Sequence, residues 1–311
     1  MTKISLVIHG GSGTILKENM TPEIEAGYMK GLETALEAGY SELEKGHSAI
    51  EAVKAAVISL EDNILFNAGR GSVFTKNGKH EMDAAIMDGK NLSAGAVASV
   101  HNIRNPVLLA EKVMMESEHV FLCGEGADEF AKKMNIKTEN DEYFFSQFRY
   151  DQWQKIKDKN SSALDHDVLL NENKFGTVGA VACDINGNIA AATSTGGMTN
   201  KDFGRIGDSS LIGAGTYANN KTCAISCTGH GEPFMKVVAA YDVSCLMEYK
   251  GLSLEEAMKV VVMDKLVKMD GDGGMIGVDA KGNAAMIFNC AGMYRGMKDS
   301  EGKYQVAIYR N

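Results

Sequence analysis

Two pairs of apolar segments, each joined by a short loop rich in Asn and Gly, most constrain the fold of this chain. Residues 177–183 and 189–195 flank the loop Asp-Ile-Asn-Gly-Asn, and residues 275–278 and 284–288 flank Asp-Ala-Lys-Gly-Asn. Loops this short form β-hairpins, so the strands that they join run antiparallel. The sequence therefore predicts antiparallel sheets and not the parallel sheet of a doubly wound fold.

Amphipathic segments with helix-start signals surround these strands. Thr21-Pro22 fits an N-cap followed by a first-turn proline, while Ser48-Ala-Ile-Glu and Ser253-Leu-Glu-Glu fit capping boxes. Helical blocks beside antiparallel strands favour an α+β fold with two sheets between helix layers, although periodicity alone leaves the stacking open. Further helices are predicted at 106–116, 125–134 and 232–249, and further strands at 3–8, 82–87, 94–100 and 119–123.

Composition narrows the classes of partner. The 311 residues are 44% hydrophobic, which is enough for a substantial core. The net charge is -9 without a dense Lys/Arg run, so nothing indicates binding to nucleic acid or to an anionic membrane. Residues 1–9 lack the features of a secretory signal and no apolar stretch could span a bilayer, which favours a cytoplasmic protein. The six scattered cysteines are expected to be reduced core thiols.

The composition changes between residues 137 and 174, where Asn, Asp, Lys, Ser and Gln dominate and apolar periodicity is weak. This pattern is typical of a mobile linker, with room for a short helix around Gln152. Such a segment inside a compact domain needs a reason, and proteolytic processing beside it would be one. The segment is followed by Gly176 and by Thr177, which opens an apolar strand.

Thr177 alone says little, because a threonine that opens a strand usually reflects β-propensity. The motifs around it are more informative. In the C-terminal half they are Gly176-Thr-Val-Gly, Thr193-Ser-Thr-Gly-Gly-Met-Thr-Asn, Gly204-Arg-Ile-Gly-Asp-Ser, Gly213-Ala-Gly-Thr-Tyr-Ala-Asn-Asn and Ser226-Cys-Thr-Gly-His-Gly-Glu. In the N-terminal half they are His9-Gly-Gly-Ser-Gly, Leu65-Phe-Asn-Ala-Gly, Met82-Asp-Ala-Ala-Ile-Met-Asp-Gly and Arg104-Asn-Pro. In this order and spacing they resemble the plant-type asparaginases and isoaspartyl peptidases, a family of N-terminal-nucleophile hydrolases.

The resemblance covers nearly the whole chain apart from the polar segment. Its departures are small, such as Ser12 where many members have alanine. It implies one domain over residues 1–311, folded as a four-layer αββα sandwich with mostly antiparallel sheets. It also implies self-cleavage between Gly176 and Thr177 into an α subunit, residues 1–176, which carries the linker of about 137–176, and a β subunit, residues 177–311.

Self-cleavage would solve a chemical problem of the intact chain. A threonine hydroxyl is a poor nucleophile until a base takes its proton, and this region shows no Ser-His-Asp or Cys-His set. A free α-amino group on Thr177, with an ordinary pKa of about 7.7–8.0, could serve as that base. In the intact chain this nitrogen is an amide, so activity is expected to require the cut.

The resemblance assigns Thr177 as the nucleophile and Thr195 as its hydrogen-bond partner. It assigns Thr228 and the Gly229 N–H group to the oxyanion hole, where charge on the tetrahedral intermediate is held. It also puts Gly11 near the nucleophile.

The resemblance further assigns substrate binding to Arg205, Asp208, Gly229 and Asn67. Arg205 and Asp208 would clamp the free α-carboxylate and α-ammonium groups of the substrate. Without the resemblance this pair would be interpreted as an ordinary loop salt bridge, which is the commoner arrangement.

No organic cofactor is implied, but relatives bind sodium through backbone carbonyls of one loop. The corresponding residues here are Leu60, Glu61, Asn63, Phe66, Ala68 and Arg70. Carbonyl ligation leaves almost no trace in a sequence, so this ion rests on the resemblance alone. The same resemblance implies assembly as a dimer of α/β heterodimers.

The leading hypothesis is an autoprocessed hydrolase of β-aspartyl dipeptides and L-asparagine that works through a β-aspartyl-threonine ester. One alternative is a glycosylasparaginase-type amidase, although such relatives carry Thr-Ser-Thr-Asn-Gly where this chain has Thr193-Ser-Thr-Gly-Gly. A protease that cuts after aspartate suits Arg205 and Asp208 less well. An uncleaved precursor that acts as a binding protein also stays open.

Overall fold

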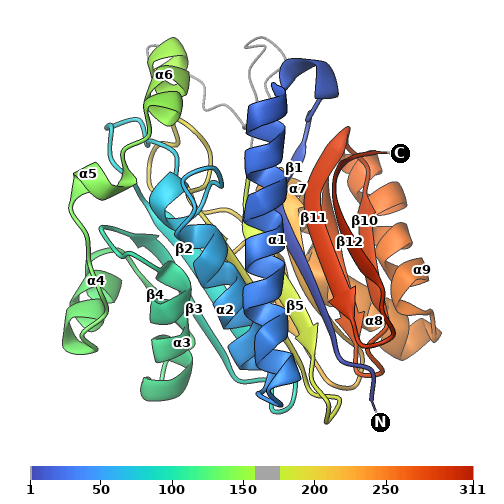
Figure 1. The fold of residues 1–311 in the computed structure, drawn as a ribbon. Coiled ribbons are helices and arrows are strands. Elements are labelled where there is room, and N and C mark those ends of the chain that lie inside the picture. Colours follow the sequence, from blue (N-terminus) through green and yellow to red (C-terminus); the bar gives the residue numbers. More distant parts are fainter. Residues whose placement is uncertain (1, 158–175, 311) are drawn as a thin grey trace.

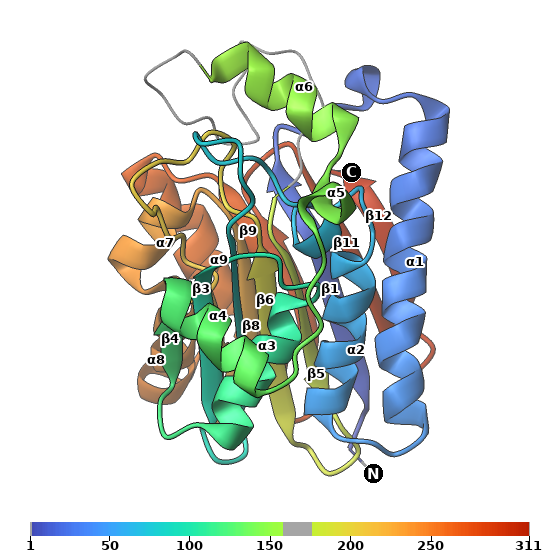
Figure 2. The same ribbon diagram turned by 90° about the vertical axis from the view of Figure 1, so that its left-hand side faces the viewer.

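Helices and strands of this chain stack in four layers (Figure 1, Figure 2), as described by a computed structural model over residues 2–157 and 176–310. The strands are β1 (Ser5–Gly13), β2 (Met82–Asp88), β3 (Ala94–Val100), β4 (Phe121–Cys123), β5 (Val178–Cys183), β6 (Ile189–Thr195), β7 (Thr216–Ala218), β8 (Cys223–Gly229), β9 (Gly273–Asp279), β10 (Ala284–Phe288), β11 (Gly292–Asp299) and β12 (Tyr304–Tyr309). The main helices are α1 (Pro22–Glu44), α2 (Ala49–Glu61), α3 (Pro106–Glu116), α4 (Gly124–Lys133), α5 (Asp141–Phe144), α6 (Gln147–Ile156), α7 (Gly231–Val237), α8 (Ala239–Lys250) and α9 (Leu254–Lys259), which continues as the π-helical η4 (Val260–Leu266).

The strands form two sheets that face each other. The large sheet has the order β12-β11-β1-β5-β6-β2-β3-β4, and the small sheet has the order β10-β9-β8-β7. All neighbours are antiparallel except β3 and β4. Helices α1 to α3 cover the outer face of the large sheet, and α8 and α9 cover that of the small sheet (Figure 1). The predicted α+β sandwich with mostly antiparallel sheets is confirmed.

The central strands are apolar on both faces because both faces are buried. In β1, Leu6 and Ile8 belong to the core shared with α1 and α2, while Val7 belongs to the core shared with the small sheet. In β5, Ala180 faces the helices and Val181 faces the small sheet in the same way. Successive side chains of a strand point to opposite faces of the sheet, so every second residue of β1 and β5 lies in the layer between the sheets.

Local sequence signals located most of these elements correctly. Ser253 and Glu256 form the complete predicted capping box. At Ser48 the side chain accepts a hydrogen bond from the Glu51 N–H group, as an N-cap should. The helix predicted over 232–249 is instead two helices, because Val238 adopts a left-handed conformation with φ +51 between α7 and α8.

The prediction of a mobile linker that begins at residue 137 is wrong for the stretch up to residue 157. Helix α5 and helix α6 occupy most of it, and α6 includes Gln152, where a short helix was predicted. Phe144 is buried, and the Trp153 ring stacks on Phe74 with centroids 5.7 Å apart. The Asn200 side chain donates to the Ile156 carbonyl at 3.4 Å, which ties the end of α6 to the C-terminal half. The rest of the predicted linker, residues 158–175, lies outside the described residues.

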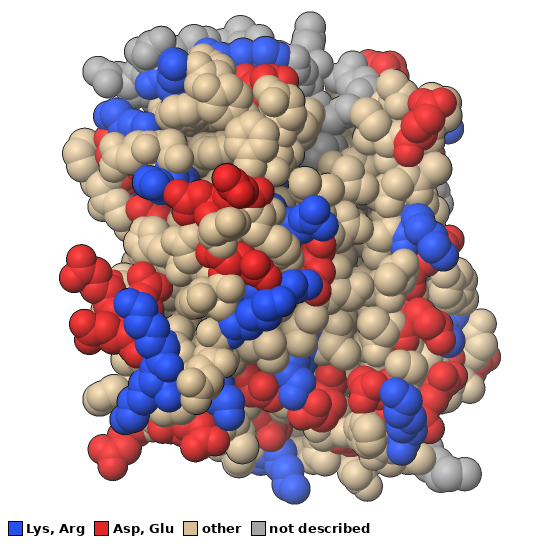
Figure 3. All heavy atoms as spheres, turned by 60° about the vertical axis from the view of Figure 1, so that its left-hand side comes forward, with Lys and Arg blue, Asp and Glu red and all other residues tan. Residues whose placement is uncertain are grey.

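All six cysteines are free thiols, but Cys123 is exposed and is not a core residue as predicted. On the face shown in Figure 3, acidic and basic side chains are interspersed and do not gather into one basic area. Within residues 2–157 and 176–310, no helix combines the length and the hydropathy needed to cross a bilayer.

Candidate active site

Thr177 lies directly before β5, at one end of the layer between the sheets. Thr177 and Val181 are separated by an even number of positions along the strand direction, so both side chains point to the face that lies between the two sheets. The residue is buried and lines a small cavity of about 20 Å³. That space holds about one water molecule, so an amino-acid substrate does not fit while the chain is uncut. The other lining residues are Gly176, Thr195, Gly197, Met198, Arg205, Gly207, Asp208, Ser209, Gly229 and Gly231.

The Thr177 hydroxyl donates a hydrogen bond to the Thr195 hydroxyl, with the oxygens 3.1 Å apart. The same Thr195 oxygen accepts from the Gly197 N–H group at 3.0 Å, which fixes its position. The Ser209 hydroxyl lies 3.4 Å from the Thr177 hydroxyl on another side. Within the described residues, no carboxylate or imidazole hydrogen-bonds the Thr177 hydroxyl. A base for this nucleophile is therefore absent from the side chains next to it.

Two features next to Gly176 suit the stabilisation of an oxyanion. Among the described residues the buried Thr228 hydroxyl has no hydrogen-bond partner, and a Cβ built on Gly176 would lie 3.6 Å from it. Gly229 has φ +140 and packs against the Asp272 carbonyl and the Gly273 Cα, so no side chain fits there. A buried donor without a partner is costly unless something occupies it during function.

Gly11 lies against Gly176, because a Cβ on Gly11 would come within 2.6 Å of the Gly176 nitrogen. Gly11 also has φ +116, at a bulge where the register between β1 and β11 shifts. The expected position of Gly11 near the nucleophile therefore agrees with the geometry.

Asp208 is buried in the cavity wall, and its Oδ2 atom has no hydrogen-bond partner within residues 2–157 and 176–310. Its carboxylate sits between Gly215 and Gly231, where a Cβ at either position would come within 2.8 Å of a carboxylate oxygen. Burial raises the pKa of Asp208 to about 7, although the nearby Arg205 charge opposes this rise. The site thus holds an acceptor that is ready for a cationic group.

Arg205 does not pair with Asp208. Its Nε and Nη2 atoms donate to the two carboxylate oxygens of Glu232 at 3.0 and 2.9 Å, and His230 lies 3.0 Å from the same carboxylate. Burial opposes ionisation of Glu232, but the hydrogen bonds from His230 and Arg205 outweigh it and lower its pKa. Glu232 holds one edge of the guanidinium and leaves Nη1 for another anion. Glu232 ends one of the sequence motifs, but no role was predicted for it.

His9 is a second residue whose role the sequence did not reveal. Its Nδ1 atom lies 3.0 Å from the Thr177 carbonyl and its Nε2 atom lies 2.8 Å from the Ser226 hydroxyl. Burial lowers the pKa of His9 to about 3, so the ring is neutral, with Nδ1 as the donor to the carbonyl. The hydrogen bonds continue from Ser226 to Thr193 at 2.7 Å and from Thr216 to Thr193 at 2.6 Å. This buried chain fixes the backbone of Thr177 from the N-terminal half.

Asn67 is not among the residues that line the cavity. Its side chain donates to the Gly197 carbonyl at 2.8 Å and accepts from the Val73 N–H group at 3.0 Å. Both ends of the amide are therefore occupied by the backbone. Asn67 supports the turn after Thr195, and the predicted contact with substrate has no support in this geometry.

The loop predicted to bind sodium turns so tightly that backbone carbonyls crowd around two glycines. A Cβ on Gly71 would collide with the Phe66 and Ile64 carbonyls, and a Cβ on Gly69 would lie 2.6 Å from the Glu61 carbonyl. Gly69 has φ +51, which the turn requires. Carbonyl oxygens are the ligands that hard cations prefer, and two of the six predicted ligands, Glu61 and Phe66, have carbonyls at these close approaches. Sodium binding stays a prediction.

A threonine directly before an inner strand of an αββα sandwich is typical of the N-terminal-nucleophile hydrolase fold. The sequence matches the asparaginase family over residues 2–308, and the chain belongs to this family. It is 49% identical to an isoaspartyl peptidase of Escherichia coli, over 100% of this chain and 97% of the relative. An isoaspartyl peptidase/L-asparaginase of Xenopus laevis is 43% identical over 98% of this chain and 94% of its own length. A plant-type L-asparaginase of Pyrococcus abyssi is 39% identical over 98% of this chain and 100% of its own length.

The raised pKa of Asp208 predicts how Asp208→Asn changes stability with pH. Because the pKa is higher in the folded state than its ordinary value of 3.8, wild-type stability falls as pH rises from about 4 to about 7. Relative to wild type, the variant should gain about 2–3 kcal/mol between pH 5 and pH 8, at about 1.4 kcal/mol per pH unit. Urea unfolding at the two pH values, with both proteins kept uncut by Thr177→Ala, measures this gain. An equal difference at both values would contradict it.

Proposed function

We propose that this protein is an isoaspartyl peptidase and L-asparaginase that activates itself by cutting the bond between Gly176 and Thr177. The observation that carries the proposal is the partnerless Asp208 carboxylate oxygen in the same cavity as the Thr177 hydroxyl. A buried carboxylate of this kind suits the α-ammonium group of an aspartyl or asparaginyl substrate. The names of the relatives support the same substrates.

Maturation begins with the Thr177 hydroxyl, whose proton is directed toward Thr195. The Thr177 oxygen attacks the Gly176 carbonyl carbon and the C–N bond breaks, while the hydroxyl proton passes to the Thr177 nitrogen, so the peptide becomes an ester and a free amine. Water then hydrolyses the ester, which leaves a carboxylate on Gly176 and a free α-amino group on Thr177. The products are the chains 1–176 and 177–311, and departure of Gly176 enlarges the cavity.

Turnover uses the new α-amino group as the base for the hydroxyl of the same residue. The Thr177 oxygen attacks the β-carbonyl carbon of the substrate, and the resulting oxyanion receives hydrogen bonds from the Thr228 hydroxyl and the Gly229 N–H group. The amine or ammonia leaves with the proton that the Thr177 α-amino group took from the hydroxyl. Water then releases aspartate from the β-aspartyl-threonine ester.

The head group of the substrate is held by two charges. Asp208 accepts the α-ammonium group, and Arg205 binds the α-carboxylate through Nη1, which does not contact Glu232. A free amino-acid head group satisfies both residues. A glycosylasparaginase-type amidase would share this head group, whereas a protease acting after aspartate would leave Arg205 opposite a neutral amide. If the chain were an uncleaved binding protein, no oxyanion would form, and the buried Thr228 hydroxyl would have no function.

A structural sodium ion belongs to the same proposal. The crowded carbonyls of Glu61 and Phe66 around Gly69 and Gly71 support it. The ion would hold the loop that carries Asn67, which in turn supports the turn after Thr195. Its contribution is therefore to the rigidity of the site and not to the chemical step. Assembly as a dimer of α/β heterodimers and residence in the cytoplasm stay predictions.

Thr177→Ala should give one uncut chain without hydrolytic activity, because the substitution removes the hydroxyl used in both reactions. Thr177→Ser should still cut itself, but more slowly. Denaturing electrophoresis and ammonia release from L-asparagine measure the two outcomes. Cleavage of the alanine variant at the same bond would overturn the assignment of the nucleophile.

The two charged residues predict selectivity for β-aspartyl bonds. β-Asp-Leu and L-asparagine should be hydrolysed and α-Asp-Leu should not. Arg205→Ala should lower kcat/KM by about 10²-fold, since a charge-assisted contact is lost, while self-cleavage continues. Arg104→Ala, which removes an ion pair with Asp62 outside the cavity, is the matched control. Comparable rates on α- and β-aspartyl dipeptides would show that Arg205 does not set the specificity.

The sodium ion predicts a specific salt effect on stability. At ~100 mM, NaCl should raise the Tm by about 2 °C more than choline chloride does, if the ion binds with a Kd near ~10 mM. Gly69→Ala, which crowds the Glu61 carbonyl, should abolish the difference. Gly126→Ala meets no atom within 4 Å and should retain it. Equal effects of both salts on the wild-type protein would remove the ion from the account.

A further inference from the structure

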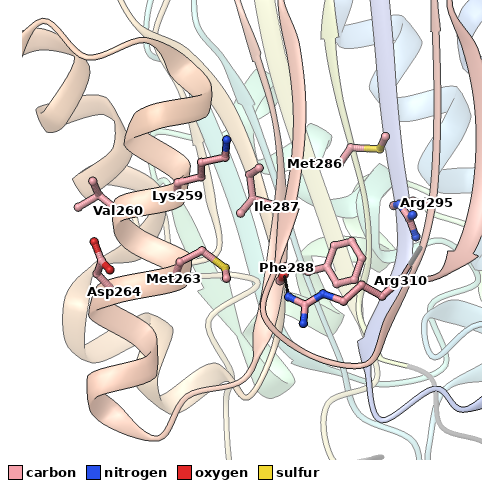
Figure 4. A pocket seen from close by; sticks show the side chains of 9 residues that line it. All are labelled: Lys259, Val260, Met263, Asp264, Met286, Ile287, Phe288, Arg295 and Arg310. Atoms are coloured by element: carbon pink, nitrogen blue, oxygen red, sulfur yellow. Dashed lines mark hydrogen bonds between the residues drawn. The ribbon is translucent and has the colours of Figure 1, made fainter.

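A groove separates η4 from the outer edge of both sheets, away from the catalytic cavity. It has a volume of about 590 Å³ and is lined from α9, η4, β10, β11 and the residue after β12 (Figure 4). No residue that lines the catalytic cavity also lines this groove. The volume is in the range of small-molecule sites, so the groove is large enough for a ligand of its own.

Two guanidinium groups flank one aromatic ring on the strand side of the groove. The carbon at the centre of the Arg295 guanidinium lies 4.9 Å from the Phe288 ring centroid, and that of Arg310 lies 5.6 Å away. Arg310 is exposed and donates to the Phe288 carbonyl at 3.0 Å. Figure 4 shows the three side chains together on this side. Such a pair presents several N–H donors around an apolar face.

Arg295 carries a charge that the described residues do not neutralise. Only 5% of the residue is exposed, and its guanidinium donates to the carbonyls of Met293, Ile308 and Tyr309 at 3.0–3.2 Å. Within residues 2–157 and 176–310, neither Arg295 nor Arg310 forms an ion pair with a carboxylate. Buried charges are normally paired, because an uncompensated one is costly. An anion in the groove would supply the missing charge.

The other charges of the groove leave this side positive. Lys259 is paired with Glu255 at 2.6 Å. Asp264 lies on the helix, across the groove from the arginines (Figure 4). A local excess of positive charge is notable in a chain whose net charge is -9. It favours an anionic ligand over a cationic or neutral one.

The remaining wall is apolar and partly open to solvent. Met263 is 43% exposed, and Met286, Ile287 and Phe288 are all partly exposed. Methionine side chains adapt to ligands of different shape. The groove therefore joins an anion-binding end to an adaptable apolar surface.

We propose that this groove binds a small organic carboxylate with an apolar tail. The carboxylate binds at the exposed Arg310 guanidinium beside the Phe288 ring, where the charge of Arg295 also attracts it, and the tail lies along Met263 and Ile287. A guanidinium binds a carboxylate through paired hydrogen bonds, so the two arginines select this head group over a hydroxyl of similar size. The proposal does not depend on the catalytic function.

The test is a titration of the full chain with octanoate, followed by NMR of methionine methyl groups. The chain has 18 methionines, of which Met263 and Met286 line the groove and are assigned from their Leu variants. Met115, which is 67% exposed on α3, reports non-specific effects. Octanoate should shift the Met263 and Met286 signals at millimolar concentration, while 1-octanol should shift them at least about tenfold more weakly.

Substitutions then assign the interaction. Arg310→Gln should weaken the octanoate Kd about tenfold, because one charge-assisted contact is lost, and Lys132→Gln on α4 should leave it unchanged. Met263→Glu should also weaken binding through repulsion of the carboxylate. Equal shifts with octanol and octanoate, an unchanged Kd in Arg310→Gln, or no shift at Met263 and Met286 would overturn the proposal. Dissociation of an oligomer by Met263→Glu in sedimentation would also overturn it, because the groove would then be an interface between copies.

Discussion

The hydrogen-bonded ladder between β1 and β5 is the constraint on which the rest of the structure depends. Strand β5 follows Thr177 directly and lies between β1, from the N-terminal half, and β6, from the C-terminal half. The register pairs Ser5 with Cys183 and His9 with Gly179. A cut before Thr177 leaves this ladder and both apolar faces of β5 intact. The fold can therefore tolerate a free amino terminus in the middle of its largest sheet.

The same ladder explains why polar groups collect at one end of the inner layer. His9 comes from β1, Thr177 from the start of β5, Thr195 from the end of β6 and Thr228 from β8. Alternation directs all four side chains between the sheets. Most of this layer is apolar, so a hydroxyl or carboxylate without a partner is costly there. The Thr228 hydroxyl and the Asp208 Oδ2 atom carry that cost, and the proposed substrate is what would satisfy both.

Local signals in the sequence were sufficient for much of the fold. The loops at 184–188 and 279–283 and the capping box at Ser253 depend on neighbouring residues, and each was predicted correctly. The packing of helix α6 was not predicted, because it involves residues far away in the sequence, such as Phe74, on which the Trp153 ring stacks. The break at Val238 likewise carries no Gly or Pro signal. Short-range patterns do not contain such long-range contacts.

The residues of the candidate site likewise divide into those that the sequence motifs predicted and those whose contacts depend on the fold. Thr177, Thr195 and Gly229 were found from motifs, and the cavity brings them together. The pairing of Arg205 with Glu232 was not predicted, because it joins a loop to the first turn of α7 and their approach depends on the fold. The central claim is that the cut creates the catalytic base. Intact-mass spectrometry of freshly folded protein, sampled beside its asparaginase activity, tests this most directly. The account predicts activity that rises in proportion to the chain beginning at Thr177, whereas full activity before that chain forms would contradict it.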